Sequence, residues 1–130
     1  MADLLLVDDD PDLTELLAAL LEGAGHTVRV ARDGEEGLAL VEARQPDVVL
    51  LDVEMPRLTG PEMTYRMFVH DVGQEKIPIL LMSGVANLAR VASLVGTPYF
   101  LAKPYAFDAV LRLVARAAVE RRAPMPLMTS

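Results

Sequence analysis

Four short apolar segments of the sequence each end in side chains that can do chemistry. Asp8 and Asp9 follow the first of these segments, Asp52 follows the next, and Ser83 and Lys103 follow the last two. Three carboxylates that lie close together repel one another unless a cation sits between them. Oxygen ligands without His or Cys select Mg²⁺, Mn²⁺ or Ca²⁺, and Mg²⁺ keeps ligand positions for water and phosphate oxygens. These residue types therefore favour a magnesium site that acts on a phosphoryl group.

The remaining needs of phosphoryl transfer are also met by these residues. An aspartate carboxylate can attack phosphorus, and Asp52 is free to act as that nucleophile. Lys103 offers a positive charge to one phosphoryl oxygen, and Ser83 offers a hydrogen-bond donor to another. Lysine is rare in this chain, since only Lys76 and Lys103 accompany ten arginines. The place of Lys103 at the end of an apolar segment, before a proline, is therefore informative.

The elements that must position these residues alternate along the chain. Strands are predicted over residues 4–7, 27–31, 48–51, 77–82 and 99–102, because each is a short apolar run. Helices are predicted over residues 11–23, 34–44, 60–71, 87–94 and 107–122. Asp10 and Asp33 are placed to cap the first two helices, with Pro11 at the first helical position.

This alternation predicts an α/β fold with a parallel sheet and helices on both faces. Five such units fit a flavodoxin-like, doubly wound (βα)5 architecture. In a parallel sheet the carboxyl ends of all strands share one edge, and ligands bind there where the strand order reverses. The three carboxylates, the hydroxyl and the ammonium are therefore expected to meet in one crevice.

Length and composition limit the other possibilities. The 130 residues, of which 52% are hydrophobic, suit one domain over residues 1–122, followed by a flexible tail or linker over residues 123–130. A net charge of −7 argues against direct nucleic-acid binding. Cysteine is absent, which excludes disulfides and thiolate metal sites. No signal peptide or membrane span is apparent, so the cytoplasm is the expected compartment.

The same residues resemble the receiver domains of response regulators, over about residues 3–122. The resemblance rests on five motifs in order, namely Val7-Asp8-Asp9, Asp52-Val53-Glu54-Met55-Pro56, Gly60, Ser83-Gly84 and Lys103-Pro104. It implies the strand order 2-1-3-4-5, which spacing alone does not settle. It also implies the following roles: Asp8 and Asp9 as the acidic metal-binding pair, Asp52 as phosphoacceptor and metal ligand, the backbone carbonyl of Glu54 as a further ligand, Ser83 and Lys103 as the hydroxyl and lysine of the site, and Ser83 and Phe100 as switch residues.

The resemblance implies a signalling phosphoacceptor rather than an enzyme, apart from self-catalysed phosphotransfer and autodephosphorylation. A histidine kinase or histidine phosphotransfer protein would supply the phosphoryl group in the presence of Mg²⁺ or Mn²⁺. Phosphorylation would then shift the helix 4–strand 5–helix 5 surface, whose residues include Arg90, Tyr99, Phe100 and Tyr105. The output would be a protein partner or a missing output domain. Two departures from the family pattern are Ser83, where Thr is commoner, and Phe100, which has no hydroxyl and must act by packing.

Two other functions fit parts of the sequence. A haloacid-dehalogenase-like phosphatase would use Asp8 as nucleophile and Asp10 as acid and base, although Pro11 and Asp12 do not continue that motif well. A receiver fold could also serve only for docking, without phosphorylation. The site of phosphorylation separates the first from the receiver, and an Asp52-dependent response to Mg²⁺ and a phosphoryl analogue separates the second.

Overall fold

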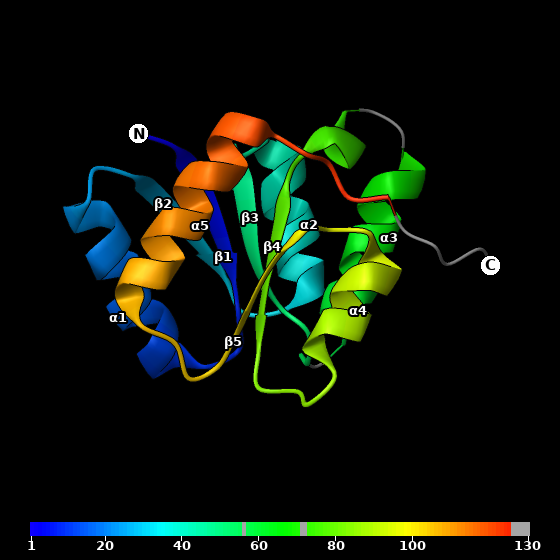
Figure 1. The fold of residues 1–130 in the computed structure, drawn as a ribbon. Coiled ribbons are helices and arrows are strands. Elements are labelled where there is room, and N and C mark those ends of the chain that lie inside the picture. Colours follow the sequence, from blue (N-terminus) through cyan, green and yellow to red (C-terminus); the bar gives the residue numbers. More distant parts are fainter. Residues whose placement is uncertain (56, 71–72, 126–130) are drawn as a thin grey trace.

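The computed structural model describes residues 1–55, 57–70 and 73–125, and these form a single α/β unit (Figure 1). The strands are β1 (Asp3–Val7), β2 (Thr27–Ala31), β3 (Val48–Asp52), β4 (Ile79–Ser83) and β5 (Tyr99–Ala102). The helices are α1 (Pro11–Gly23), α2 (Gly34–Ala43), α3 (Gly60–His70), the short 3-10 helix η1 (Gln74–Lys76), α4 (Leu88–Val95) and α5 (Phe107–Glu120). The predicted alternation of strands and helices is confirmed.

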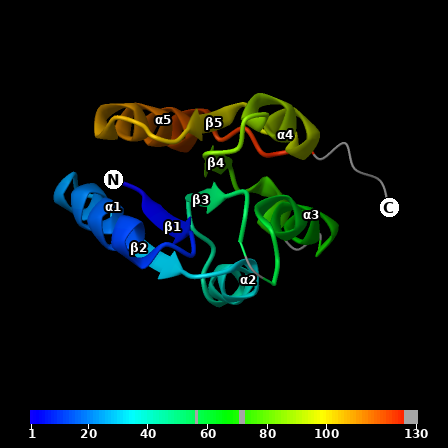
Figure 2. The same ribbon diagram turned by 90° about the horizontal axis from the view of Figure 1, so that it is seen from below.

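The five strands form one parallel sheet in the order β2-β1-β3-β4-β5, which confirms the flavodoxin-like prediction. Alternate residues of each strand face opposite sides. Leu5, Val49 and Leu81 belong to the core beneath α2, α3 and α4, whereas Leu6 and Leu50 belong to the core beneath α1 and α5. Figure 2, viewed nearly along the strands, shows these two helical layers on either side of the sheet. The central strand β3 is buried along its whole length, as its unbroken apolar sequence requires.

Side-chain caps explain where three helices begin, and two of them, at Asp10 and Asp33, were predicted. The Asp10 side chain accepts hydrogen bonds from the backbone N–H groups of Asp12 and Leu13, and Asp33 accepts one from Glu36. At α3 the Thr59 hydroxyl accepts from the Glu62 N–H while the Glu62 carboxylate accepts from the Thr59 N–H. Each cap satisfies backbone donors that a helix leaves unpaired. These caps direct the loops that follow β1, β2 and β3.

Two element boundaries differ from the prediction by two residues, and the other described boundaries agree to within one residue. β4 begins at Ile79 rather than at residue 77, because Ile77 closes η1 by donating its N–H to the Gln74 carbonyl. α5 ends at Glu120, since Arg121 takes a left-handed conformation with φ 52°. α3 extends to His70, and its predicted last residue, Asp71, lies outside the described residues.

The segment after α5 lies against the domain as far as it is described. Pro124 is buried, and the Met125 N–H donates to the Gly96 carbonyl at 3.2 Å. Residues 126–130 lie outside the described part, so the flexibility of the tail and the domain boundary at residue 122 stay predictions. Among the described helices, none has the length and apolarity that a membrane crossing demands.

Candidate functional site

The carboxyl ends of β1 and β3 bring three carboxylates together. Asp8 and Asp9 follow the last residue of β1, and Asp52 is the last residue of β3. One carboxylate oxygen from each of the three lies within 4.8 Å of the others. Asp8 and Asp52 are buried, at 1% and 7% exposure, whereas Asp9 is exposed. The predicted meeting of residues from two neighbouring strands is therefore present, with one side open to solvent.

Lys103 reaches this cluster from the carboxyl end of β5. Its Nζ lies 2.8 Å from Asp8 Oδ2 and 3.9 Å from Asp52 Oδ2. Burial alone would lower the pKa of Lys103, but the hydrogen bond to Asp8 and the charges of Asp52 and Asp8 outweigh it and raise the pKa. The lysine is therefore charged across the ordinary pH range and faces both buried carboxylates. The Lys103–Pro104 peptide bond that follows is cis.

The electrostatics of the cluster centre on Asp52. Burial and the neighbouring charge of Asp8 raise the pKa of Asp52 to about 6, while Lys103 and the backbone N–H groups of Val53 and Glu54 lower it in part. One ammonium therefore does not balance three carboxylates. A divalent cation among them would supply the missing charge and hold Asp52 ionised.

The loop after β3 is held close to Asp52. The Gly60 N–H donates to the Val53 carbonyl at 3.0 Å, which closes the loop over residues 53–60. A Cβ on Gly60 would collide with the Asp52 carbonyl oxygen, so only glycine allows this close approach. Met55 and Leu58 anchor the loop in the core at 8% and 3% exposure. This arrangement keeps the N–H groups of Val53 and Glu54 on the Asp52 carboxylate.

The two predicted switch residues belong to β4 and β5, and Ser83 directly follows Met82, the residue of β4 that pairs with Asp52. Ser83 ends β4 and is buried, and its hydroxyl oxygen accepts a hydrogen bond from the Val85 N–H at 3.3 Å. The Ser83 carbonyl accepts from the Lys103 N–H at 2.9 Å, which ties the ends of β4 and β5 together. Phe100 lies in the middle of β5, with 40% of its surface exposed. Neither residue contacts Asp52 through an interaction of the described residues.

The donor set suits a hard divalent cation. Three carboxylates with oxygen atoms at mutual distances below 4.8 Å, and no His or Cys among them, match the oxygen coordination of Mg²⁺. The exposed Asp9 leaves the solvent side open, where water or a phosphoryl oxygen would complete the coordination. The residues present therefore fit the cation that the sequence predicted.

Sequence reasoning missed an apolar surface beside the cluster. On α1, Leu16 and Leu20 are 60% and 39% exposed. Two adjoining hollows of about 400 and 150 Å³ share Leu13 and Tyr105 in their walls. The first also includes Lys103 and Pro104, and the second includes Leu16, Leu17, Leu20 and Phe107. The available signal was the width of the α1 stripe, since five leucines exceed what one buried face needs.

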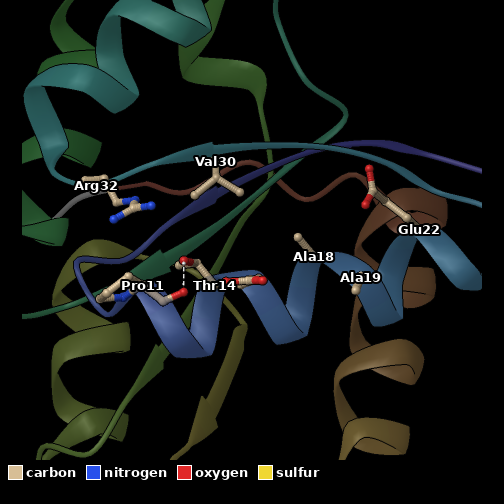
Figure 3. Close-up of a pocket in the computed structure, with 8 residues that line it drawn as sticks. Pro11, Thr14, Ala18, Ala19, Glu22, Val30 and Arg32 are labelled. Carbon is tan, nitrogen blue, oxygen red and sulfur yellow. Dashed lines mark hydrogen bonds between the residues drawn. The ribbon is translucent and has the colours of Figure 1, made fainter.

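A separate groove lies between α1 and the edge strand β2 (Figure 3). Its volume is about 400 Å³, and Val30 of β2 and Arg32, which follows that strand, face Thr14 and Ala18 of α1 across it. Thr14 bonds the carbonyl of Pro11 at its own helix end rather than pointing a free hydroxyl into the groove. The groove includes neither the acidic cluster nor Lys103, so the chemistry of the molecule lies elsewhere.

Comparison with known proteins agrees with this geometry. The family model described as the response regulator receiver domain matches residues 4–115. The response regulator MprA of Mycolicibacterium vanbaalenii is 37% identical over 123 residues, which cover 93% of this chain and 52% of MprA. The nitrogen assimilation regulatory protein NtrX of Azorhizobium caulinodans is 32% identical over 119 residues, covering 88% of this chain and 26% of NtrX. The chain thus spans about a quarter to a half of these curated relatives.

A solved structure of similar length gives the same result. The chemotaxis protein CheY4 of Vibrio cholerae superimposes with a TM-score of 0.80 at 31% identity, covering 89% of this chain and 98% of CheY4. The chain belongs to the response regulator receiver family. It is a receiver domain of a two-component system, whose acidic pocket of Asp8, Asp9 and Asp52 serves a phosphoaspartate.

This assignment decides between the receiver and the phosphatase that the sequence left open. The chain is a signalling phosphoacceptor rather than a true enzyme, and its acidic triad is typical of the Mg²⁺ site of receivers. A receiver implies a cognate histidine kinase as partner. The family match overturns the phosphatase alternative. The Asp10 carboxylate, the acid and base of that alternative, accepts hydrogen bonds from the first turn of α1.

Proposed function

We propose that Asp52 accepts a phosphoryl group from the phosphohistidine of a histidine kinase or a histidine phosphotransfer protein. An Asp52 carboxylate oxygen bonds to phosphorus as the phosphorus–nitrogen bond breaks, and the imidazole leaves with the electron pair of that bond. The carrying observation is the convergence of three carboxylates, with oxygen atoms within 4.8 Å of one another, and the pairing of two of them, Asp8 and Asp52, with Lys103. Water later hydrolyses the acyl phosphate and restores the Asp52 carboxylate.

Each residue of the cluster has a separate part in this reaction. Asp8, Asp9, Asp52 and the backbone carbonyl of Glu54 would hold Mg²⁺ or Mn²⁺, which neutralises charge on the phosphoryl oxygens when bound. The ammonium of Lys103 already lies 3.9 Å from Asp52 and would pair with another phosphoryl oxygen. Ser83 donates its hydroxyl to a third oxygen. Its oxygen accepts from the Val85 N–H, so the hydroxyl hydrogen is available for this bond and the side chain ties the loop after β4 to the phosphoryl group.

The phosphoryl donor reaches Asp52 over the apolar surface between α1 and α5. Leu16 and Leu20 are exposed on α1, and the hollows beside them extend to Tyr105 and Lys103. An apolar face next to a charged pocket suits a partner that presents a histidine above a packed helical surface. The cognate partner therefore docks by apolar contact and aims its phosphohistidine at the open side of the acidic cluster.

Phosphorylation then alters the surface formed by α4, β5 and α5. When Ser83 turns toward the phosphoryl group, the loop after β4 follows, and Phe100 moves from its 40% exposed position into the space left behind. We expect the domain to act in the cytoplasm. The signal passes to a protein partner or to an output domain of a longer protein, and no direct contact with nucleic acid is expected of this acidic domain.

Beryllofluoride, which mimics a phosphoryl group on aspartate, tests the proposal. With Mg²⁺ present, we expect amide NMR signals around Asp52, Ser83 and Lys103 to shift in the wild-type protein. The Asp52→Asn protein should show no such shifts, because its amide side chain offers no oxygen nucleophile. An equal response of both proteins, or none in the wild type, would favour a receiver that acts by docking alone.

A further inference from the structure

The chain does not leave the domain where α5 ends. Figure 1 shows the segment in red crossing from α5 toward α4, at the edge of the sheet opposite the carboxyl ends of the strands. We call residues 121–125 the strap. Arg121 turns the chain with φ 52°, and its guanidinium lies 3.8 Å from Asp47. The Arg122 N–H donates to the Tyr99 hydroxyl at 3.3 Å, and Pro124 is buried.

The strap ends on Gly96, the residue that closes α4. The Met125 N–H donates to the Gly96 carbonyl at 3.2 Å. Gly96 has φ +81°, and a Cβ there would collide with the backbone of Met125. The two backbones are therefore in direct contact, with no side chain between them. Any movement of the last turn of α4 must displace the strap as well.

The other contact of the strap is with the first residue of β5. Tyr99 is fully buried beneath α5, and its hydroxyl also donates to the Glu120 carboxylate at 3.0 Å. The next residue, Phe100, points to the opposite side of the sheet and is 40% exposed. The strap thus makes hydrogen bonds with two elements near Phe100, namely the end of α4 and the first residue of β5.

We propose that the strap is a built-in restraint on switching, which holds α4 and β5 in the arrangement with Phe100 exposed. This inference rests on the proposed function, because it concerns the surface that phosphorylation would alter. Contacts made in one conformer and broken in the other bias the equilibrium toward the first. By thermodynamic reciprocity, occupation of Asp52 by a phosphoryl analogue must loosen the strap.

Removing the strap should therefore favour binding of the phosphoryl analogue. A chain that ends at Arg122 lacks the contacts of Pro124 and Met125, and it should bind beryllofluoride in the presence of Mg²⁺ more tightly than the full chain. We expect a gain of roughly threefold to tenfold, the range that one net hydrogen bond gives. Amide NMR titration of the two proteins measures this ratio.

Glycine substitutions distinguish the effect of displacing the strap from the effect of destabilising the fold in general. Gly96→Ala forces the strap away and should also raise the affinity for beryllofluoride. Gly25→Ala imposes comparable backbone strain at the end of α1, with φ +100° and only the Met1 side chain near its Cβ, and should leave the affinity unchanged. Gly23→Ala, where a Cβ meets nothing within 4 Å, controls for the substitution itself.

Hydrogen exchange tests the reciprocal effect in the full chain. Saturation with Mg²⁺ and beryllofluoride should speed exchange of the Met125 amide, while exchange in α1 stays unchanged. Equal affinities of the full and shortened chains, or weaker binding by the shortened chain, would overturn the strap proposal alone. If the wild-type protein bound no beryllofluoride, both the strap and the proposed function would be overturned.

Discussion

The carboxyl ends and the amino ends of the parallel strands form two opposite edges of the sheet. The carboxylates at these two edges differ in how they are paired with positive charges. At the carboxyl edge three carboxylates lie together, and among the described residues the Lys103 ammonium pairs with two of them, Asp8 and Asp52. At the amino edge the carboxylates are paired: Asp3 lies 2.9 Å from Arg44 and 3.9 Å from Arg29, and Asp47 lies 3.8 Å from Arg121. The Asp3 N–H also donates to the Asp47 carboxylate at 2.8 Å. One edge is balanced within the chain, whereas the other is left short of positive charge.

This contrast separates stabilising charges from functional ones. A protein that needed only to fold would not bury Asp8 and Asp52 together, because like charges in a desolvated place oppose folding. The pKa of Asp52, raised to about 6, shows that this arrangement disfavours the charged carboxylate. The imbalance becomes useful once a divalent cation and a phosphoryl group enter, since the pocket then supplies oxygen ligands that are already in position.

The sharpest test of this contrast changes one aspartate at each edge to asparagine. Asp52→Asn should abolish phosphorylation by acetyl phosphate, because it removes the nucleophile, and should raise the melting temperature, because it removes a destabilising buried charge. Asp47→Asn should keep full phosphorylation and lose at most about 1 kcal/mol of stability. Intact-protein mass spectrometry and thermal unfolding measure the two effects.

The matched pair has a clear contrary outcome. Phosphorylation of the Asp52→Asn protein at the wild-type level would place the acceptor elsewhere. A drop in melting temperature for Asp52→Asn as large as that for Asp47→Asn would mean that the two edges do not differ in electrostatic strain.

The pH dependence of stability should follow Asp52 when no divalent cation is present. The pKa of Asp52 is raised from 3.8 in the unfolded chain to about 6 in the fold. Its contribution to stability is therefore present below pH 4 and is lost as the pH rises through 6. Relative to Asp52→Asn, wild-type stability should fall over this window by at most about 3 kcal/mol. Denaturant unfolding in EDTA at several pH values measures the difference, and a flat difference would contradict the assignment.

Added Mg²⁺ should offset the excess negative charge of the three carboxylates and so stabilise the folded protein. At a concentration ten times its dissociation constant, a ligand that binds only the folded state stabilises by about 1.4 kcal/mol. We expect a corresponding rise in the melting temperature of roughly 3–5 °C at pH 7. Asp9→Asn should reduce this rise, whereas Asp3→Asn should retain it. Equal Mg²⁺ stabilisation of both variants would show that the cation binds outside the predicted pocket.

The smallest effect is expected from the paired charges of the amino edge. Arg44 is 61% exposed, so its ion pair with Asp3 is screened by solvent. Arg44→Gln should cost about 0.2–1 kcal/mol at low salt and less at high salt, with phosphorylation unchanged. Chemical denaturation at two salt concentrations measures this. A loss of phosphorylation in this variant would show that the ion pairs of the amino edge affect the phosphorylation site.

Much of the site could be predicted because each residue stands at the end of an apolar strand. Parallel strands bring their carboxyl ends to one edge, so Asp8, Asp52 and Lys103 were predicted to meet although 95 positions separate the first from the last. The cap residues Asp10 and Asp33 were also predictable, since capping depends on neighbouring backbone groups. The strand order needed the family resemblance, because spacing does not specify which strands are neighbours.

The features that escaped prediction depend on distant contacts. Periodicity marks Leu16 and Leu20 as apolar, but it does not tell that they are 60% and 39% exposed in the fold. The contact of Met125 with Gly96 joins residues 29 positions apart through their backbones, which no side-chain pattern records. β4 begins at Ile79, two residues later than predicted, because η1 and its C-terminal cap at Ile77 precede it. Local patterns thus specify elements and their ends, whereas surfaces between elements require the fold.

Manganese broadening of amide NMR signals tests the central claim most directly, because a bound Mn²⁺ ion broadens only nearby resonances. In place of Mg²⁺, it should erase signals around Asp8, Asp9, Asp52 and Glu54 at low stoichiometry, and spare those of Asp3 and Asp47 at the opposite edge. Asp9→Asn should weaken the effect. Broadening that centred on the amino edge, or that spread evenly over the acidic surface, would contradict a single cation site among these three carboxylates.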